Sequence, residues 1–181
     1  MKALIVVLIA IGFFECSDSR TKQIRSFLKN KKGESICMPD SFNVKSLEQD
    51  STYSFLVSKE FVNFPKLRIV TSINGDCHAC VNQLKEWKSI INKFPKRKVR
   101  FLFFVYAENY PRFELMNESE INFEYPVVYD YSNAYTLKNE IPDNYLLNTM
   151  LIDSLGKIVL VGNLLKSGEI LKLYKDAILG K

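Results

Sequence analysis

The chain has 181 residues, of which 47% are hydrophobic and 13% aromatic, so it can bury one sizeable core and fits a single domain with a short N-terminal extension. The formal net charge is only +5, and the 25 Lys and Arg are spread along the whole length. The densest basic cluster, residues 93–100, falls where a helix should end, and cations suit the negative end of a helix dipole. Composition and charge therefore argue against nucleic acid as a partner.

The first residues have the pattern of an export signal. A short positive start is followed by residues 3–14, an uncharged and mostly apolar run that is shorter than the ~20 residues needed to span a bilayer. Cys16 stands where a lipoprotein precursor carries its lipidated cysteine, although Glu15 is unusual before such a cysteine. Ser17 and Ser19 offer the competing cleavage pattern of a soluble secreted protein. We favour export to the periplasm or cell envelope, with a membrane anchor through Cys16.

Export changes how the remaining cysteines are interpreted. In an oxidising compartment thiols pair, whereas in the cytosol the same spacing would equally suit a zinc half-site. Once Cys16 is lipidated or removed, Cys37, Cys77 and Cys80 remain, and one thiol is left over. We expect this to be Cys37, as a small buried hydrophobic residue rather than a third redox thiol.

The residues ahead of the cysteine pair predict a small extension. Residues 20–30 have a helical apolar face, and residues 35–40 and 51–58 look like short strands, which we interpret as a hairpin added to a sheet edge. The expected units are a leader and tether over 1–19, the extension over 20–59, and the main domain over 60–181.

The main domain alternates strands and helices. Residues 67–73 are rich in β-branched side chains and end at a turn, after which apolar side chains from Val81 to Phe94 recur at helical spacing. The almost wholly apolar run 99–107 predicts a central strand, covered on both faces. Further helices are predicted over 112–120, 132–140 and from Ser167 to Gly180 with Leu173 on its buried face, and further strands over 125–129, 147–153 and 157–162. This order predicts an α/β domain with a central mixed sheet flanked by helices.

Cys77 and Cys80 lie three positions apart, between a predicted strand and a predicted helix. Two such thiols can close a disulfide when the first lies at a helix N-terminus, where free N–H groups and the helix dipole favour a thiolate. His78 between them can stabilise that thiolate when protonated, or can simply be an exposed residue at the helix start. Asp76 opposes the thiolate with a negative charge. The pattern indicates redox chemistry.

Two later segments complete a resemblance. Tyr-Pro-Val-Val-Tyr-Asp at 125–130 and Leu-Ile-Asp-Ser-Leu-Gly-Lys-Ile-Val at 151–159 follow the strand and CxxC helix as they do in thioredoxin-like proteins. Residues 60–179 thus resemble the TlpA/ResA group of this superfamily, with a βα insertion in the fold and an N-terminal hairpin that is similar in outline.

The resemblance implies an exported thiol-disulfide oxidoreductase with Cys77 as nucleophile and Cys80 as the resolving thiol. It implies no cofactor, and its partners would be cysteine-containing exported proteins and an upstream thiol reductant. Substrate-binding residues are expected beside the cysteines and in the loop that faces them: His78, Leu147, Asn148 and Thr149.

The chain departs from the family pattern at three places. Residues 146–149 contain no proline where the family usually has a cis-proline, so we expect a trans peptide there. Thr71 stands where thioredoxins have a buried acid. Asp76 replaces the usual Trp before the first cysteine, and His78-Ala79 replaces Gly-Pro between the two.

Other functions remain open at this stage. The two thiolates can hold a soft metal such as Cu(I), helped by His78 or Met150. The domain can also be a degenerate one, with a structural disulfide or a partner-binding surface. A peroxidase is disfavoured because Asn74 stands where peroxiredoxins have a threonine, and a nucleotide-binding role lacks any glycine-rich signature.

Overall fold

The computed structural model describes residues 22, 24–38, 41–46, 49–56 and 67–180. The predicted export signal and Cys16 lie outside these residues, so the leader and the lipid anchor stay predictions. Within the described part of the chain, no helix is both long and apolar enough to span a bilayer.

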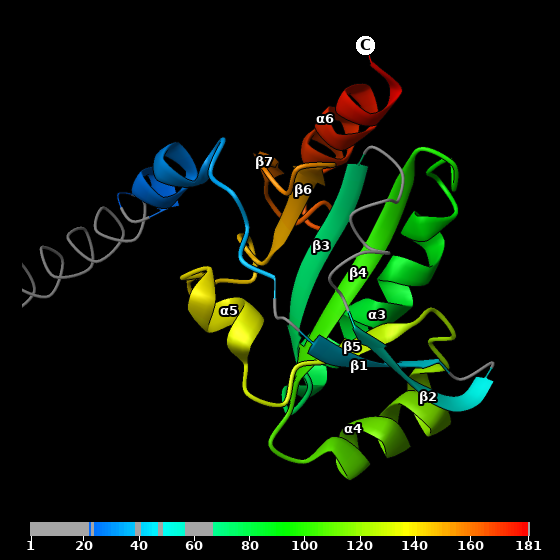
Figure 1. Cartoon of the computed structure of the whole chain (residues 1–181). Helices are drawn as coiled ribbons and strands as arrows, with labels where there is room; N and C mark the ends of the chain where they lie inside the picture. Colours follow the sequence, from blue (N-terminus) through cyan, green and yellow to red (C-terminus); the bar gives the residue numbers. More distant parts are fainter. Residues whose placement is uncertain (1–21, 23, 39–40, 47–48, 57–66, 181) are drawn as a thin grey trace, which may run out of the picture.

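A seven-stranded mixed sheet forms the centre of the molecule, in the order β2-β1-β5-β4-β3-β6-β7 (Figure 1). Its strands are β1 (Ser41–Ser46), β2 (Gln49–Leu56), β3 (Leu67–Asn74), β4 (Val99–Tyr106), β5 (Val127–Tyr129), β6 (Thr149–Asp153) and β7 (Ile158–Val161). The inner three, β5, β4 and β3, are parallel, and the outer strands on both sides pair antiparallel. The apolar β4 lies in the middle, as its sequence predicts.

The helices are α3 (His78–Ile91), α4 (Tyr110–Met116) with the π-helical turn η1 (Asn117–Ile121), α5 (Ala134–Lys138) and α6 (Gly168–Leu179). On one face of the sheet, α3, η1 and α6 bury a core in which Trp87 meets Phe103 edge to face at 5.3 Å. On the other face Tyr135 of α5 stacks on Phe104 at 4.3 Å, and Phe27 of the helix at 24–31 packs against this second core. Helices therefore flank the sheet on both faces, as predicted.

The N-terminal hairpin is present, but its first strand is not where the sequence suggested. β1 pairs with β2 and with β5, so the hairpin extends the sheet edge as expected. The prediction of a strand over 35–40 was wrong for its described residues. Ser35 makes only an isolated bridge to Lys157, and the chain there bonds to the opposite side of the sheet through Ile36 N to Gly156 O. Residues 39–40 and 57–58 lie outside the described part.

The ends of α6 agree with the sequence. Ser167 caps it by accepting the N–H groups of Glu169 and Ile170, and Gly180 ends it with a φ of 74°. Leu173 was wrongly placed on its buried face, because it is 55% exposed while Tyr174 and Ile178, one turn apart, carry the packing.

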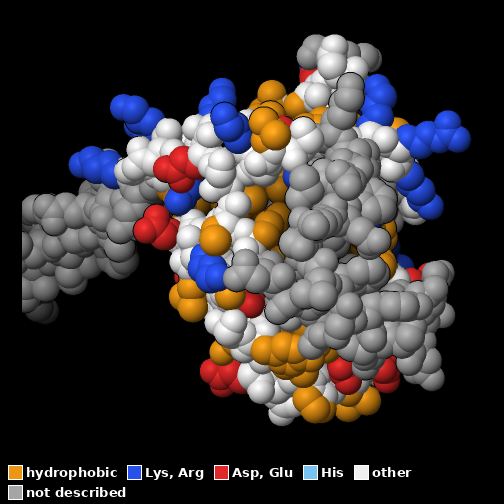
Figure 2. Space-filling view, viewed as in Figure 1, with side chains coloured by type: hydrophobic (Ala, Val, Ile, Leu, Met, Phe, Trp, Pro, Cys, Tyr) orange, Lys and Arg blue, Asp and Glu red, His pale blue; other side chains and the backbone are white. Residues whose placement is uncertain are grey.

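On the face seen in Figure 2, the described Lys and Arg side chains are dispersed around the rim rather than gathered in one patch.

Candidate redox site

The turn that delivers the cysteines depends on Gly75. Its N–H donates to the carbonyl of Tyr106 at 2.7 Å, which draws the turn tightly against the end of β4. A Cβ at this position would lie 2.9 Å from the Cβ of Ala107 and 3.2 Å from the Tyr106 oxygen. Only glycine fits this close approach without a shift of its neighbours.

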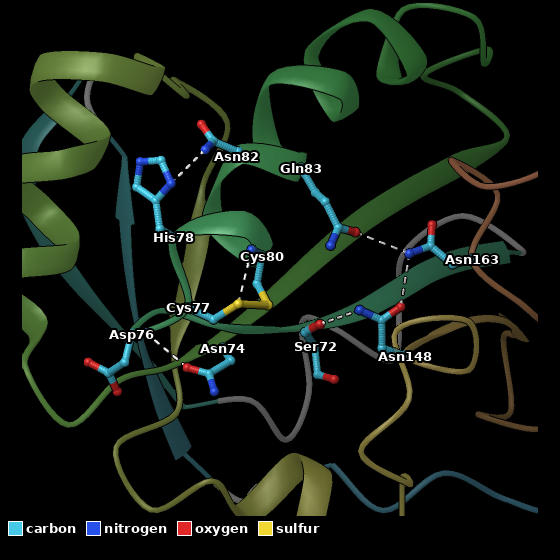
Figure 3. The surroundings of a disulfide bond; sticks show 10 residues. All are labelled: Ser72, Asn74, Asp76, Cys77, His78, Cys80, Asn82, Gln83, Asn148 and Asn163. Atoms are coloured by element: carbon cyan, nitrogen blue, oxygen red, sulfur yellow. Dashed lines mark hydrogen bonds between the residues drawn. A yellow bond between two sulfur atoms is a disulfide. The ribbon is translucent and has the colours of Figure 1, made fainter. Parts of the chain in front are cut away.

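Cys77 is the N-cap of α3 and forms a disulfide with Cys80 (Figure 3). Its Sγ accepts the backbone N–H of Cys80 at 3.3 Å, and its carbonyl accepts the N–H of Val81 at 3.0 Å. A sulfur in this position receives a helix N–H and faces the positive end of the helix dipole, and both interactions favour a thiolate after reduction. The position predicted for Cys77, at the first turn, is confirmed.

Both cysteines are half-buried, and Cys80 also lines a cavity of about 280 Å³. The cavity lies at the carboxyl ends of β3 and β4, beside the loop ahead of β6. Its lining includes Ser72, Gln83, Tyr106, Asp143, Tyr145 and Asn148. Concave sites of this kind, with polar groups converging on a reactive one, are where substrates bind in most enzymes.

Asp76 is engaged with the loop that follows β4. Its carboxylate accepts the backbone N–H of Glu108 at 2.7 Å and that of Asn109 at 3.2 Å. The Asn109 side chain in turn caps α4 by accepting the N–H of Arg112. Sequence reasoning treated Asp76 only as a charge beside Cys77 and missed this role in joining the CxxC turn to the α4 insertion.

His78 points away from the disulfide (Figure 3) and matches the exposed alternative, with 61% of its side chain accessible. Its Nδ1 lies 3.0 Å from the amide nitrogen of Asn82, and its Nε2 lies 3.4 Å from a carboxylate oxygen of Glu120. Because the amide nitrogen of Asn82 can only donate, Nδ1 is the acceptor and Nε2 donates to Glu120.

The three loop residues predicted to bind substrate have different surroundings. Leu147 and Thr149 are buried, with 3% and 0% exposure, whereas the half-buried Asn148 lines the cavity with Cys80. Asn148 is bonded to β3 twice: its carbonyl accepts the N–H of Ser72 at 3.0 Å, and its side-chain amide donates to the Ser72 carbonyl at 2.9 Å. The described residues contain no cis peptide bond, as the lack of proline led us to expect.

Thr71 occupies the place of the buried acid and pairs with Thr149 across β3 and β6. The two hydroxyl oxygens are 2.9 Å apart and both side chains are buried. The Tyr174 hydroxyl donates to the Thr149 carbonyl at 3.3 Å, and burial raises the pKa of that phenol, so it stays a neutral donor. Neutral hydroxyl groups of described residues therefore fill the place of the buried acid.

Asn163, which follows β7, was missed by sequence reasoning. It is 1% exposed, and its amide nitrogen lies near the Tyr145 carbonyl (2.9 Å), the Asn148 side-chain oxygen (3.2 Å) and Gln83 Oε1 (3.2 Å). The only signal in the sequence is a polar residue directly after an apolar strand, which is common in turns.

Cys37 is exposed and has a free thiol, so the expectation that it would be buried was wrong. Its backbone is held against α5, since its N–H donates to Asn139 Oδ1 at 2.6 Å and its carbonyl accepts from Asn139 Nδ2 at 2.8 Å. In this extended segment side chains alternate, and the neighbours Ile36 and Met38 take the inward positions.

The structure argues against Met150 as a metal ligand. Met150 is fully buried in the core on the α5 face, whereas Cys80 packs against the core on the α3 face. Across residues 67–180 and the other described segments, no three His, Cys, Asp or Glu side chains are grouped to hold a metal ion.

No protein-family model and no curated protein sequence matches this chain. Several solved structures do match it in fold. The thioredoxin domain of a thiol-disulfide oxidoreductase from Bacteroides vulgatus has a TM-score of 0.55 and 13% identity, over 81% of this chain and 97% of that one. StoA from Bacillus subtilis has a TM-score of 0.53 and 17% identity, over 76% and 98%.

A 2-Cys peroxiredoxin from Plasmodium vivax matches with a TM-score of 0.59 and 16% identity, over 81% of each chain. Identities this low show the fold alone. The chain therefore has the thioredoxin-like fold that its CxxC context and its β6-β7 hairpin predict.

Proposed function

We propose that this thioredoxin-like protein is a thiol-disulfide oxidoreductase that exchanges disulfides with other exported proteins through Cys77 and Cys80. The observation that carries the proposal is the position of the pair: Cys77 is the N-cap of α3, and its sulfur accepts the Cys80 N–H. The matched structures include a thiol-disulfide oxidoreductase domain from Bacteroides vulgatus and a thiol:disulfide interchange protein from Bacteroides sp., and both support the same chemistry.

In the reducing direction, the Cys77 thiolate attacks one sulfur of a substrate disulfide. A mixed disulfide forms and the other substrate sulfur leaves as a thiolate. The Cys80 thiolate then attacks Cys77 Sγ, which releases the second substrate thiol and closes the Cys77–Cys80 disulfide. The substrate gains two electrons, the protein loses two, and an upstream dithiol must reduce the pair again.

The roles of the two cysteines follow from their positions. Cys77 at the helix cap receives a backbone N–H, which suits an attacking thiolate. Cys80 lies one turn into α3 and contacts the core, with its Cα 5.2 Å from that of Cys77, so it can reach the first sulfur. The carboxylate of Asp76, next to Cys77, is satisfied by two backbone N–H groups of the neighbouring loop.

Export, a lipid anchor on Cys16 and action in the cell envelope complete the proposal. They rest on the apolar run at 3–14 and on the cysteine that follows it. Metabolic labelling with a fatty acid analogue tests the anchor. Label should be incorporated by the full chain and be absent from Cys16→Ala, and equal labelling of both would contradict it.

Two measurements test the redox function. The reduction potential of Cys77–Cys80 is measured against glutathione, and exchange with a disulfide-bonded protein is measured for the wild type, Cys77→Ser and Cys37→Ser. We expect a measurable equilibrium, loss of exchange in Cys77→Ser, and wild-type exchange in Cys37→Ser. Unchanged exchange in Cys77→Ser, or a pair that glutathione cannot reduce, would instead favour a structural disulfide.

A peroxidase is less well supported, although one matched structure is a peroxiredoxin. Asn74 occupies the position of the peroxidase threonine, and its side-chain oxygen is engaged by the Asp76 N–H at 2.9 Å. The second thiol lies only three residues after the first, in the same helix turn. Both features suit disulfide exchange better than reduction of a peroxide.

A further inference from the structure

The loop that shares the cavity with Cys80 has little regular structure of its own. We call residues 142–148 the facing loop. It is folded by short turns, with Leu147 N donating to Asn144 O at 2.9 Å and Leu146 N donating to Asn144 Oδ1 at 3.0 Å. These contacts shape the loop internally, but they do not fix its position relative to the cysteines on α3.

Asn148 fixes one end of the facing loop to β3. In an antiparallel ladder, a residue opposite Ser72 would use its backbone N–H and C=O. Here the carbonyl of Asn148 accepts the Ser72 N–H, but the side-chain amide of Asn148 donates to the Ser72 carbonyl. Two hydrogen bonds thus hold this end, without a proline.

Asn163 links the same loop to α3 (Figure 3). Its backbone N–H donates to the Leu146 carbonyl at 2.9 Å, and its side-chain amide donates to the Tyr145 carbonyl and to Asn148 Oδ1. The same amide also reaches Gln83 Oε1 at 3.2 Å, one turn beyond Cys80 on α3. Its two hydrogens are therefore shared among three acceptors, on the loop and on the cysteine helix.

We propose that Asn163 is a positioning residue that, through Asn148 and Gln83, fixes the facing loop relative to the Cys77–Cys80 pair. Buried amide hydrogen bonds thereby hold the loop at residues 146–149, where the chain has no proline. The inference rests on the proposed function. A small disulfide needs only the sulfur of Cys77, whereas a protein disulfide must also be accommodated by the loop, so the link matters for large substrates.

The test compares two probes with the reduced full chain: insulin as a protein disulfide and bis(2-hydroxyethyl) disulfide as a small one. Asn163→Asp keeps the oxygen that accepts the Leu165 N–H but loses the amide hydrogens. Gln83→Met is a milder variant that removes only the arm on α3. Asn139→Asp is the matched control, because it alters another buried asparagine, which ties Cys37 to α5.

We expect Asn163→Asp to react with insulin about tenfold more slowly or worse, and with the small disulfide at nearly the wild-type rate. Gln83→Met, whose side chain also lines the cavity, should likewise slow the reaction with insulin. Asn139→Asp should keep the wild-type ratio of the two rates. Equal losses on both probes, or an unchanged ratio, would overturn the positioning role.

Amide hydrogen exchange separates this inference from the proposed function. If the wild type reacts with neither probe, the proposed function fails. The role of Asn163 in fixing the facing loop is then judged by amide hydrogen exchange alone. Faster exchange of the Leu146 and Leu147 amides in either variant, with β3 and β4 unchanged, would support the link. Unchanged protection of these two amides in both variants would overturn it.

Discussion

The Asp76 carboxylate accepts the backbone N–H of Glu108 at 2.7 Å, across the gap between the CxxC turn and the loop after β4. The same carboxylate accepts the N–H of Asn109, which caps α4. The residue directly before Cys77 thus connects the N-terminus of α3 to the loop that leads into α4. The two backbone N–H groups stabilise its charge.

Replacing Asp76 by Ala should lower the free energy of unfolding of the oxidised protein by about 2 kcal/mol, because two charge-assisted hydrogen bonds to the backbone are lost. Urea denaturation measures the change. Asp143→Ala is the control, since Asp143 is an exposed acid for which no hydrogen bond or ion pair to the described residues is found. Equal stability of the two variants would show that the Asp76 contacts do not hold the loop.

Gly75→Ala should destabilise the protein by roughly 1–3 kcal/mol, because the new Cβ would meet the Ala107 Cβ at 2.9 Å and backbone oxygen at 3.2 Å. Gly168→Ala is the matched control. Gly168 begins α6 with no atom within 4 Å of an added Cβ, so alanine there should be neutral or slightly stabilising. Thermal denaturation measures the stability of both variants. A Gly75→Ala protein as stable as wild type would contradict the close contact between residue 75 and the end of β4.

Much of this fold could be predicted because its strongest signals are local. The apolar run of β4 placed it in the centre, and the spacing from Val81 to Ile91 gave α3 its buried face. The first strand of the N-terminal hairpin was misplaced because its position is set by pairing with β5, more than 80 residues away in the chain. Local propensity does not contain that information.

The cysteines of the site could be predicted from the sequence, but the residues that position the loops around them could not. The CxxC spacing and the strand before it predict that Cys77 and Cys80 lie at the start of a helix and can form a disulfide, which is how the structure has them. Asn163 and Asp76 bond to backbone groups of loops that are distant in sequence, so no local sequence pattern predicts their roles. The burial of Cys37 was wrongly predicted because an extended segment buries every second residue. The sequence does not show whether Cys37 or its two neighbours face inward.

Thr71→Val should lower the free energy of unfolding by about 1–2 kcal/mol, because it leaves the buried Thr149 hydroxyl with fewer partners. The double variant Thr71→Val/Thr149→Val removes both hydroxyls, so its loss should be smaller than the sum of the two single losses. A double-mutant cycle by urea denaturation measures this coupling, and strictly additive losses would show that the two hydroxyls do not stabilise one another.

Alkaline pH should destabilise the protein through its buried tyrosines. Tyr135 is fully buried, and its hydroxyl has no hydrogen-bond partner among the described residues. Burial raises the pKa of this phenol. In the unfolded chain a tyrosine ionises near pH 10, so below that pH both states are protonated and nothing changes. Above it, the unfolded state loses a proton that the folded state keeps. Stability should therefore fall as pH rises, by up to about 1.4 kcal/mol per pH unit for each such tyrosine.

Tyr135→Phe separates this contribution from the others. It removes a hydroxyl without a described partner and keeps the ring stacked on Phe104, so at pH 8 the variant should be as stable as wild type or more stable by up to about 1 kcal/mol. Between pH 8 and 11 its stability should fall less steeply than that of wild type. Urea denaturation at several pH values measures both slopes. Identical slopes would mean that Tyr135 ionises in the folded protein as readily as in the unfolded chain.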